Sequence, residues 1–299
     1  MTLRQIGEEK LLTRILPHLP ANRRVIVRAG DDCAVVRFRG AGDLLLLKSD
    51  CVVEGVHFTR KTPAPAAGWK AMMRPLSDFA AMSGVPEFAL ITIVISGDKQ
   101  ESWLRQFYRG LNRAAKRFNV AIVGGETGDT NGSTAVSVSV AGYAEPRRWV
   151  GRNGGKMNDD LFVTGELGGA IRLRHLNFVP RLAEARWLTR FFDIHAMIDL
   201  SDGLGSDLPR LARASNLSFV VNEKALPIAP GCSAQQAISD GEDYELLFAL
   251  SPRDRAKLEA SWKRKFPTIR LSCIGRLVRR TTSHDRTIPP GYVHFQQRR

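Results

Sequence analysis

The chain has 299 residues, of which 43% are hydrophobic and 25% charged, and its formal net charge is +14. This length allows one large domain or two domains with full cores, and no run approaches the roughly 18 apolar residues of a membrane span. The basic residues are dispersed without interleaved aromatics, so we expect a surface that attracts anionic metabolites and no nucleic-acid partner. The four cysteines form no CxxC pair, which argues against a zinc ribbon or disulfide scaffold and indicates a cytoplasmic protein.

The first 60 residues contain two places where apolar runs meet acids. Residues 1–19 predict an amphipathic helix rather than a secretory signal, because acids lie inside the pattern. Gly30-Asp31-Asp32 then separates two short apolar runs. Leu44 to Leu47 predict a buried strand that stops at Lys48-Ser49-Asp50, and VVEGVHF returns to apolar alternation with His57. Such a strand places a hydroxyl and a carboxylate at the rim of a sheet, where ligands usually bind.

Prolines and helical periodicity organise the next stretch. Pro63 to Pro65 predict a loop, and Pro75 predicts a break in the helical sequence after it. Ser77-Asp78 is then expected at the beginning of a helix, a position that both residue types favour. Residues 88–95 predict a strand, and residues 102–118 predict an amphipathic helix with its basic residues on the exposed face.

A change of composition predicts the boundary between two domains. A short strand at 120–123 runs into a loop rich in glycine and acids, and the strict alternation of 134–144 predicts a half-exposed strand. From residue 145 to 160 the chain is rich in glycine, arginine and asparagine. We therefore predict domains at 1–145 and 146–299.

The second half repeats the rhythm of strand, acidic turn, helix and strand. Its predicted strands lie at 160–164, 195–199, 217–223, 243–250 and 269–275. The two halves are expected to be α/β units with the same order of elements. No sequence period is clear enough to define a repeat.

The acids follow apolar runs or open helices at five places, namely Asp31-Asp32, Asp50, Asp78, Glu126, and Asp199 with Asp202. Carboxylates that converge without histidine or cysteine suit hard cations bound through oxygen, which indicates magnesium. The alternative is that each acid caps a helix or forms a turn. For Asp78 alone that alternative is at least as good, whereas five such placements together favour the metal site.

Glycine-rich turns accompany these acids at Gly124-Gly125 and at Gly165 with Gly168-Gly169. Glycines let backbone amides approach phosphate oxygens, which supports a phosphorylated ligand. The P-loop and Rossmann fingerprints are both absent from the sequence. Ser201 lies in DLSDG rather than GxSxG, so a serine-hydrolase triad is not indicated.

Eight motifs together resemble the thiamine-monophosphate kinase family: GDDCAVV, SDCVVEGVHF, LSDFAAMSG, VGGETGDT, VGRNGGKMNDDLFVTGELG, IDLSDG, GEDYELLF and GYVHF. They occur in the family's order and cover nearly the whole chain. The resemblance implies a superfamily that also contains aminoimidazole ribonucleotide synthetase. It further implies two α/β domains, of which the N-terminal one has a mixed sheet and pairs with a second copy in a homodimer, and a cleft for ATP and magnesium between the domains.

The implied reaction is the ATP-dependent phosphorylation of thiamine monophosphate to thiamine diphosphate. Carried over by position, the implied metal ligands are Asp32, Ser49, Asp50, Asp78, Glu126 and Asp199, with Asp202 near a further ion. Of these, three are predicted to be catalytic, namely Asp50, Asp78 and Asp199. The implied ATP-binding residues are Tyr108, Gly125, Glu126, Arg152 and Ser201. The implied substrate-binding residues are His57, Glu242 and Tyr292.

Phosphoryl transfer to a phosphate depends mainly on positioning and charge neutralisation. The acceptor oxygen is already ionised near neutral pH, so no strong general base is needed. We therefore expect direct in-line attack on the γ-phosphate without a covalent enzyme intermediate.

Structural interpretations remain open for five of these residues. His57 fits a packed strand histidine, Tyr108 a helix surface, Arg152 a solvated arginine, Glu242 a strand start and Tyr292 a tail anchor. For the whole chain, two other functions remain: a related ATP-dependent enzyme with another acceptor, or a nucleotide-binding protein without turnover.

Four residues depart from the family pattern. Glu126 and Asp240 replace an aspartate and a glycine, and Pro75 replaces an asparagine. Lys48 replaces a small hydroxyl residue, and its ammonium is suited to take the place of one cation or to contact a phosphate. Asp129, in the same loop as Glu126, is the alternative ligand there.

Overall fold

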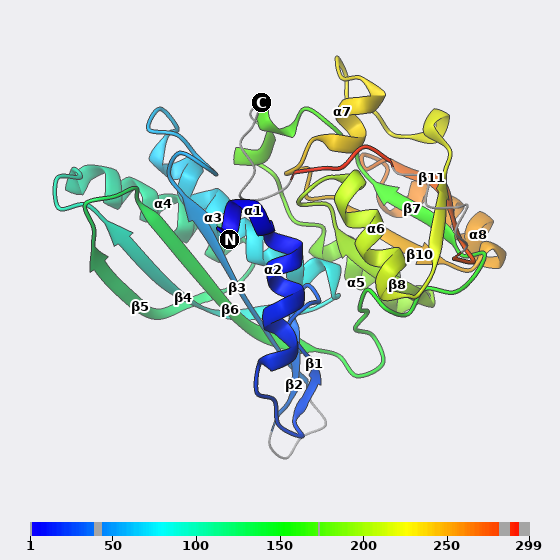
Figure 1. Ribbon diagram of the computed structural model, residues 1–299. Coiled ribbons are helices and arrows are strands. Elements are labelled where there is room, and N and C mark those ends of the chain that lie inside the picture. The colour runs from blue at the N-terminus through cyan, green and yellow to red at the C-terminus, as the bar shows by residue number, and fades with distance from the viewer. Residues whose placement is uncertain (1, 39–43, 173, 281–287, 293–299) are drawn as a thin grey trace.

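The structure is a computed structural model that describes residues 2–38, 44–172, 174–280 and 288–292. It contains two β-sheets, one from each half of the chain, with helices packed between and around them (Figure 1). This arrangement confirms the predicted α/β fold with a mixed N-terminal sheet. The last three residues of GYVHF and the basic C-terminal end lie outside the described residues.

The first sheet has the strand order β1-β2-β3-β6-β4-β5. Its strands are β1 (Val25–Val27), β2 (Ala34–Arg37), β3 (Leu44–Val53), β4 (Val85–Ile95), β5 (Ala121–Asp129) and β6 (Ala135–Ala144). The β4–β5 pair is parallel and the other pairs are antiparallel. One face carries the helices α3 (Ala64–Ala81) and α4 (Glu101–Arg117), and side chains on the opposite face are exposed.

The second sheet has the order β8-β10-β7-β11-β9 and is antiparallel throughout. Its strands are β7 (Asp160–Thr164), β8 (Ile194–Asp199), β9 (Ser218–Val221), β10 (Leu246–Leu250) and β11 (Leu271–Val278). Strand β10, which lies between β8 and β7, is buried along its whole length, as its LLFAL sequence predicts.

The α-helices are α1 (Leu3–Ile6), α2 (Glu8–Ile15), α3 (Ala64–Ala81), α4 (Glu101–Arg117), α5 (Leu182–Phe191), α6 (Leu204–Ala214), α7 (Ala234–Ser239) and α8 (Arg255–Lys265). Short 3-10 turns are η1 (Leu16–His18), η2 (Ala170–Arg172), η3 (Arg174–Leu176), η4 (Glu223–Ala225) and η5 (Pro252–Asp254). Within the described ranges, no helix has both the length and the apolar character needed to cross a membrane.

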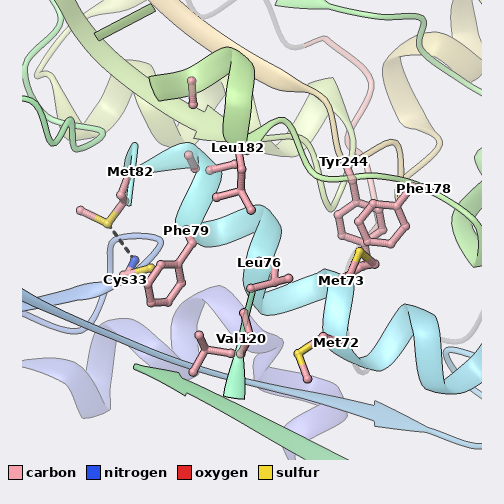
Figure 2. Packing of buried hydrophobic residues seen from close by; sticks show 14 of the residues in the cluster. Cys33, Met72, Met73, Leu76, Phe79, Met82, Val120, Phe178, Leu182 and Tyr244 are labelled. Carbon is pink, nitrogen blue, oxygen red and sulfur yellow. Dashed lines mark hydrogen bonds between the residues drawn. The ribbon is translucent and has the colours of Figure 1, made fainter. Parts of the chain in front are cut away.

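Helix α3 lies at the centre of the molecule and positions much of the candidate site. It contacts α4 and β3 of the first half and α5 and β8 of the second half. Figure 2 shows its apolar side chains, including Met73, Leu76 and Phe79, within a core that also contains Leu182 and Tyr244. One hydrophobic core therefore joins the two sheets through α3.

Two predictions around α3 were wrong. The helix begins at Ala64, inside the predicted proline loop, and it continues through Pro75 without the predicted break. Pro65 occupies the first turn, where a missing N–H costs nothing. Pro75 removes one internal hydrogen bond, but nearly every residue of α3 is buried, and this burial outweighs the local penalty. Asp78 consequently lies in the last turn of a long helix rather than at a helix start.

Three other elements differ from their predictions. The N-terminal helix is divided at Gly7, whose φ of 73° ends α1 before α2 begins. Strand β3 does not stop at Lys48-Ser49-Asp50 but continues to Val53, so Ser49 and Asp50 lie within the sheet and not at its rim. His57 lies in the turn after β3 and not on a strand. Strand β5 continues to Asp129 through the predicted glycine loop, and a Cβ at Gly125 would lie 1.8 Å from the Ile91 carbonyl oxygen. Glycine is thus required there by the close pairing of β4 and β5.

Candidate metal and substrate site

Three buried carboxylates from distant segments converge in the middle of the molecule. Asp32 precedes β2, Asp78 lies in α3 and Asp199 ends β8, and one oxygen from each lies within 4.8 Å of the other two. All three were predicted from the sequence as metal ligands. A donor set made only of carboxylate oxygens fits a hard divalent cation such as Mg²⁺.

Burial and mutual repulsion raise the pKa values of two carboxyl groups in this cluster, those of Asp199 and Asp78. Burial, with the nearby Asp32 charge, raises the pKa of Asp199 to about 7, although Ser77 donates a hydrogen bond of 2.6 Å to it. Burial and the charges of Asp50 and Asp199 also raise the pKa of Asp78 well above its usual range, against the opposing effect of Lys48. The carboxylates therefore carry more negative charge than their surroundings neutralise, and they gain from a bound cation or proton.

Lys48 supplies one positive charge to the cluster. Its Nζ lies 2.6 Å from Oδ1 of Asp78, and the nearby Asp78 and Asp50 charges raise its pKa despite burial. Burial alone would raise the pKa of Asp50, but Lys48 and Arg74 lower it overall. Lys48 and Asp50 lie on the same face of β3, because side chains alternate along a strand.

Ser49 lies on the opposite, exposed face of β3. Its hydroxyl forms hydrogen bonds with Ser137 at 3.1 Å and with Ser139 at 2.9 Å on β6. The structure thus separates the side chains of Ser49 and Asp50, which were predicted to bind metal together.

Arg152, one of the predicted ATP-binding residues, contacts the acidic cluster. Its guanidinium forms an ion pair with Asp32, and its backbone N–H donates to Oδ2 of Asp31 at 3.2 Å. The guanidinium also donates to the carbonyl oxygen of Gly30 at 3.3 Å. The alternative of a solvated arginine is therefore wrong.

A pocket between the two halves gathers five predicted site residues, namely His57, Ser201, Asp202, Glu242 and Tyr292. The same pocket is lined by Arg74 and Tyr244, and Tyr244 stacks on Phe178 with ring centroids 3.8 Å apart (Figure 2). In the sequence these residues come from segments as distant as 57 and 292. Asp202 also accepts a hydrogen bond of 2.6 Å from Arg210.

Glu242 is held by two basic side chains beneath this pocket. Nζ of the fully buried Lys70 lies 2.7 and 2.6 Å from its two carboxylate oxygens, and Nδ1 of His175 lies 2.6 Å from Oε2. Burial opposes ionisation, but these partners lower the pKa of Glu242 to about 2. Its φ of 68° shows that it does not begin a strand, and β10 starts only at Leu246.

His57 is oriented by the turn that contains it. Its Nδ1 accepts a hydrogen bond of 3.0 Å from the backbone N–H of Val53, and its carbonyl oxygen accepts one of 2.7 Å from Lys70. The imidazole is therefore fixed beside the pocket rather than packed within a strand.

The structure does not bring every predicted residue to this region. Tyr108 packs edge-on against Phe107 in α4, and the Glu126 carboxylate accepts a hydrogen bond from the adjacent Thr127 N–H. Gly125 and Glu126 lie on the edge strand β5, paired with β4. Among the described contacts of Tyr108 and Glu126, none is with Asp32, Asp78 or Asp199.

The second glycine turn is occupied by the protein's own carboxylates. The Gly168 N–H donates to Asp243 at 3.0 Å, and the Gly169 N–H donates to Asp240 at 2.9 Å. The carboxylate of Asp240 thus accepts the hydrogen bond of an amide that the sequence suggested for a phosphate.

Three basic residues of the site were missed by the sequence analysis, namely Lys70, Arg74 and His175. Lys70 and Arg74 lie in the otherwise apolar stretch GWKAMMRPL, where a charged residue on a helix needs a partner. That signal was available, but their partners lie in the other half of the chain or on β3.

Comparison with known proteins places the chain in a family. The model of the N-terminal domain of AIR synthase related proteins matches residues 30–144, and the model of their C-terminal domain matches residues 156–280. The chain is 33% identical to the thiamine-monophosphate kinase of Rhodopirellula baltica, covering 94% of this chain and 93% of that one. It is 30% identical to the thiamine-monophosphate kinase of Aquifex aeolicus, over 99% of this chain and 100% of that one.

Solved structures agree with these relatives. The structure of AaThiL complexed with AMPPCP and TMP superimposes with a TM-score of 0.83 at 29% identity, covering 98% of this chain and 99% of that one. The crystal structure of thiamine monophosphate kinase from Aquifex aeolicus gives a TM-score of 0.75 at 28% identity, over 93% and 96% of the two chains.

The fold and the two matched domains define an AIR synthase related protein. Within that class, the chain belongs to the thiamine-monophosphate kinase family, and it is an enzyme of the kinase type.

Proposed function

We propose that this enzyme phosphorylates thiamine monophosphate with ATP to give thiamine diphosphate. The observation that carries the proposal is the placement of the Asp32, Asp78 and Asp199 cluster near the pocket that contains His57 and Glu242. Arg74 links the two, since it lines the pocket and lies 3.9 Å from Asp50. The names of the relatives and the AMPPCP and TMP of the AaThiL structure supply the two substrates.

Magnesium is the proposed cofactor. Asp32, Asp78 and Asp199 would hold it, with Asp50 beside them and Asp202 near a further ion, because their oxygens match its preference. When bound, Mg²⁺ neutralises charge on the ATP phosphates. Ser49, Gly125, Glu126 and Tyr108 remain proposed ligand contacts that rest on the family resemblance alone.

The proposed reaction is a direct in-line transfer to the acceptor phosphate. Two anionic groups have to approach each other, so Lys48, Arg152 and Arg74 lower the repulsion. Ser201 and Tyr292 would orient the ligands from the second half of the chain. None of these residues has to abstract a proton, because the attacking phosphate oxygen is already ionised. A phosphorylated enzyme trapped during turnover would contradict this pathway.

The working form is proposed to be a homodimer of two-domain subunits, with domains at 1–145 and 146–299. The exposed face of the first sheet carries large apolar side chains from four strands, namely Leu47, Phe88, Leu90, Val123 and Tyr143. Such a patch is typical of a protein interface, and a second copy of the same sheet would cover it. Leu90→Asp should give a monomer in light scattering, and an unchanged dimer would place the interface elsewhere.

The reaction is tested by incubating the purified protein with ATP, Mg²⁺ and thiamine monophosphate. Chromatography with fluorescence detection of the oxidised thiamine products is expected to show thiamine diphosphate accumulating with time. Omission of Mg²⁺, with EDTA present, should stop its formation. Tight ATP binding without this product would reject the proposed reaction.

A further inference from the structure

Arg74 is a buried cation whose hydrogen-bonding capacity is not used by its surroundings. Its side chain is 15% exposed, and its Nε is buried without a hydrogen-bond partner. Within the described residues, its only ion pair is with Asp50, at 3.9 Å from Nη2 to Oδ1. That distance is too long for a hydrogen bond. Arg152, by contrast, donates hydrogen bonds from all three of its guanidinium nitrogens, to Asp32 and to the carbonyl oxygen of Gly30.

An unsatisfied buried donor in a folded protein calls for a partner. The planar guanidinium offers two parallel N–H groups, which match two oxygens of a phosphate or carboxylate. Asp50 is too distant to accept a hydrogen bond from Arg74. An anionic ligand is therefore the partner that fits the guanidinium.

The position of Arg74 identifies which anion this is. On one side lies Asp50, beside Lys48 and the carboxylate cluster. On the other side Arg74 lines the pocket that also contains His57 and Glu242. A ligand that occupies the pocket and reaches toward the carboxylates must place its own anionic group next to Arg74.

We propose that Arg74 binds the phosphate group of the acceptor and thereby makes the enzyme prefer a phosphorylated acceptor over the free alcohol. This inference rests on the proposed function, in which the acceptor phosphate attacks the terminal phosphate of ATP. Arg74 holds the attacking group between the pocket and the carboxylate cluster. Its positive charge also offsets the repulsion between the two phosphates.

The test is a comparison of two ligands with two proteins. Affinities for thiamine monophosphate and for thiamine are measured by calorimetry, with AMPPCP and Mg²⁺ present, on the wild type and on Arg74→Met. The wild type should bind thiamine monophosphate more tightly by about 10- to 150-fold, the range for hydrogen bonds to a charged group. Arg74→Met should lose that preference, while its affinity for thiamine should stay within about twofold of the wild-type value.

The matched control is Arg60→Met, which removes an arginine whose side chain is 94% exposed and which lies outside the pocket lining. It should keep the wild-type preference. Arg74→Gln gives the same test if the methionine variant does not fold. An unchanged preference in the Arg74 variants, or an equal loss of affinity for both ligands, would overturn the proposal.

The outcome separates this inference from the proposed reaction. The wild type could form no thiamine diphosphate and still show an Arg74-dependent preference for the phosphorylated ligand. That result would reject the reaction and support Arg74 as the residue that binds the acceptor phosphate, here called the phosphate anchor. If thiamine diphosphate forms and the preference does not depend on Arg74, the anchor is rejected and the reaction stands.

Discussion

Two charged clusters, both at the junction of the two halves, differ in how completely their charges are paired. Around Glu242, the ammonium of Lys70 and the ring of His175 occupy both carboxylate oxygens. Around Asp78, the oxygens of Asp32 and Asp199 crowd together, and Lys48 provides a single ammonium. The pKa of Glu242 is low, whereas burial raises the pKa values of Asp78 and Asp199.

This difference indicates that the Glu242 cluster has a structural role, whereas the acidic cluster is suited to bind a ligand. The partners of Glu242 are present in the protein itself, so the shape of that side of the pocket is set before ligands bind. The acidic cluster has Lys48 and Arg152 as its basic partners, and in the proposed function it would be completed by cations that bind with the nucleotide. The following variants test the contrast, from the largest expected effect to the smallest.

Asp78→Asn should reduce turnover by at least about a thousandfold, because loss of a metal ligand removes several kcal/mol of charge stabilisation. The chain should still fold, since the substitution removes a charge that burial disfavours. Turnover is measured as thiamine diphosphate formed per enzyme, and folding by circular dichroism. Asp98→Asn, at an exposed position, should behave as wild type. A rate within tenfold of wild type for Asp78→Asn would refute the metal role.

Lys70→Met should lower the free energy of unfolding by about 3–5 kcal/mol, because Glu242 would keep a buried charge without its main partner. Denaturant unfolding measures the loss. The double variant Lys70→Met with Glu242→Gln should recover part of it, since neither charge then remains. If the single variant were as stable as wild type, the Glu242 cluster would not be a preformed structural unit.

Stability in EDTA should depend on pH through Asp199. Its pKa rises from the ordinary 3.8 to about 7 on folding, so the folded state binds more protons than the unfolded state between those values. Its contribution to the free energy of unfolding is therefore present at low pH and is lost as pH rises toward 7. Between pH 5 and pH 7, the free energy of unfolding of Asp199→Asn should rise by about 2 kcal/mol relative to that of the wild type. Parallel pH profiles would contradict the raised pKa.

Lys48→Ser should increase the affinity for Mg²⁺ by about tenfold, because one positive charge leaves the carboxylate cluster. The change is measured by calorimetry with AMPPCP present. Lys99→Ser is the matched control, since Lys99 pairs with Glu54 rather than with the cluster. If Mg²⁺ affinity stayed the same and nucleotide affinity fell, Lys48 would instead contact a phosphate.

The backbone elements and the acids were largely predictable from local pattern. Asp32 and Asp199 adjoin apolar strands, and this arrangement identified them before any contact was known. Ser49 and Asp50, by contrast, were predicted to bind metal together, but adjacent strand residues face opposite ways and β3 places their side chains on opposite faces. Helix α3 was mispredicted at Pro75 because its burial in the core outweighs a local preference.

The partners of the charges were not predictable. The apolar stretch around Lys70 indicates that this lysine needs a partner, but its acceptor Glu242 lies 172 positions away in the sequence. The edge-strand position of Glu126 likewise depends on pairing between β4 and β5, which no local pattern specifies. Long-range contacts therefore decide which charged residues are paired within the protein and which are left to pair with a ligand.

The central claim is that the acidic cluster requires cations, and it is tested most directly by counting bound metal. Mn²⁺ is titrated into the protein with saturating AMPPCP, and free Mn²⁺ is followed by electron paramagnetic resonance. The wild type should bind at least one Mn²⁺ that Asp199→Asn does not bind, while Asp98→Asn should match the wild type. Equal numbers of bound ions in wild type and Asp199→Asn would contradict the account.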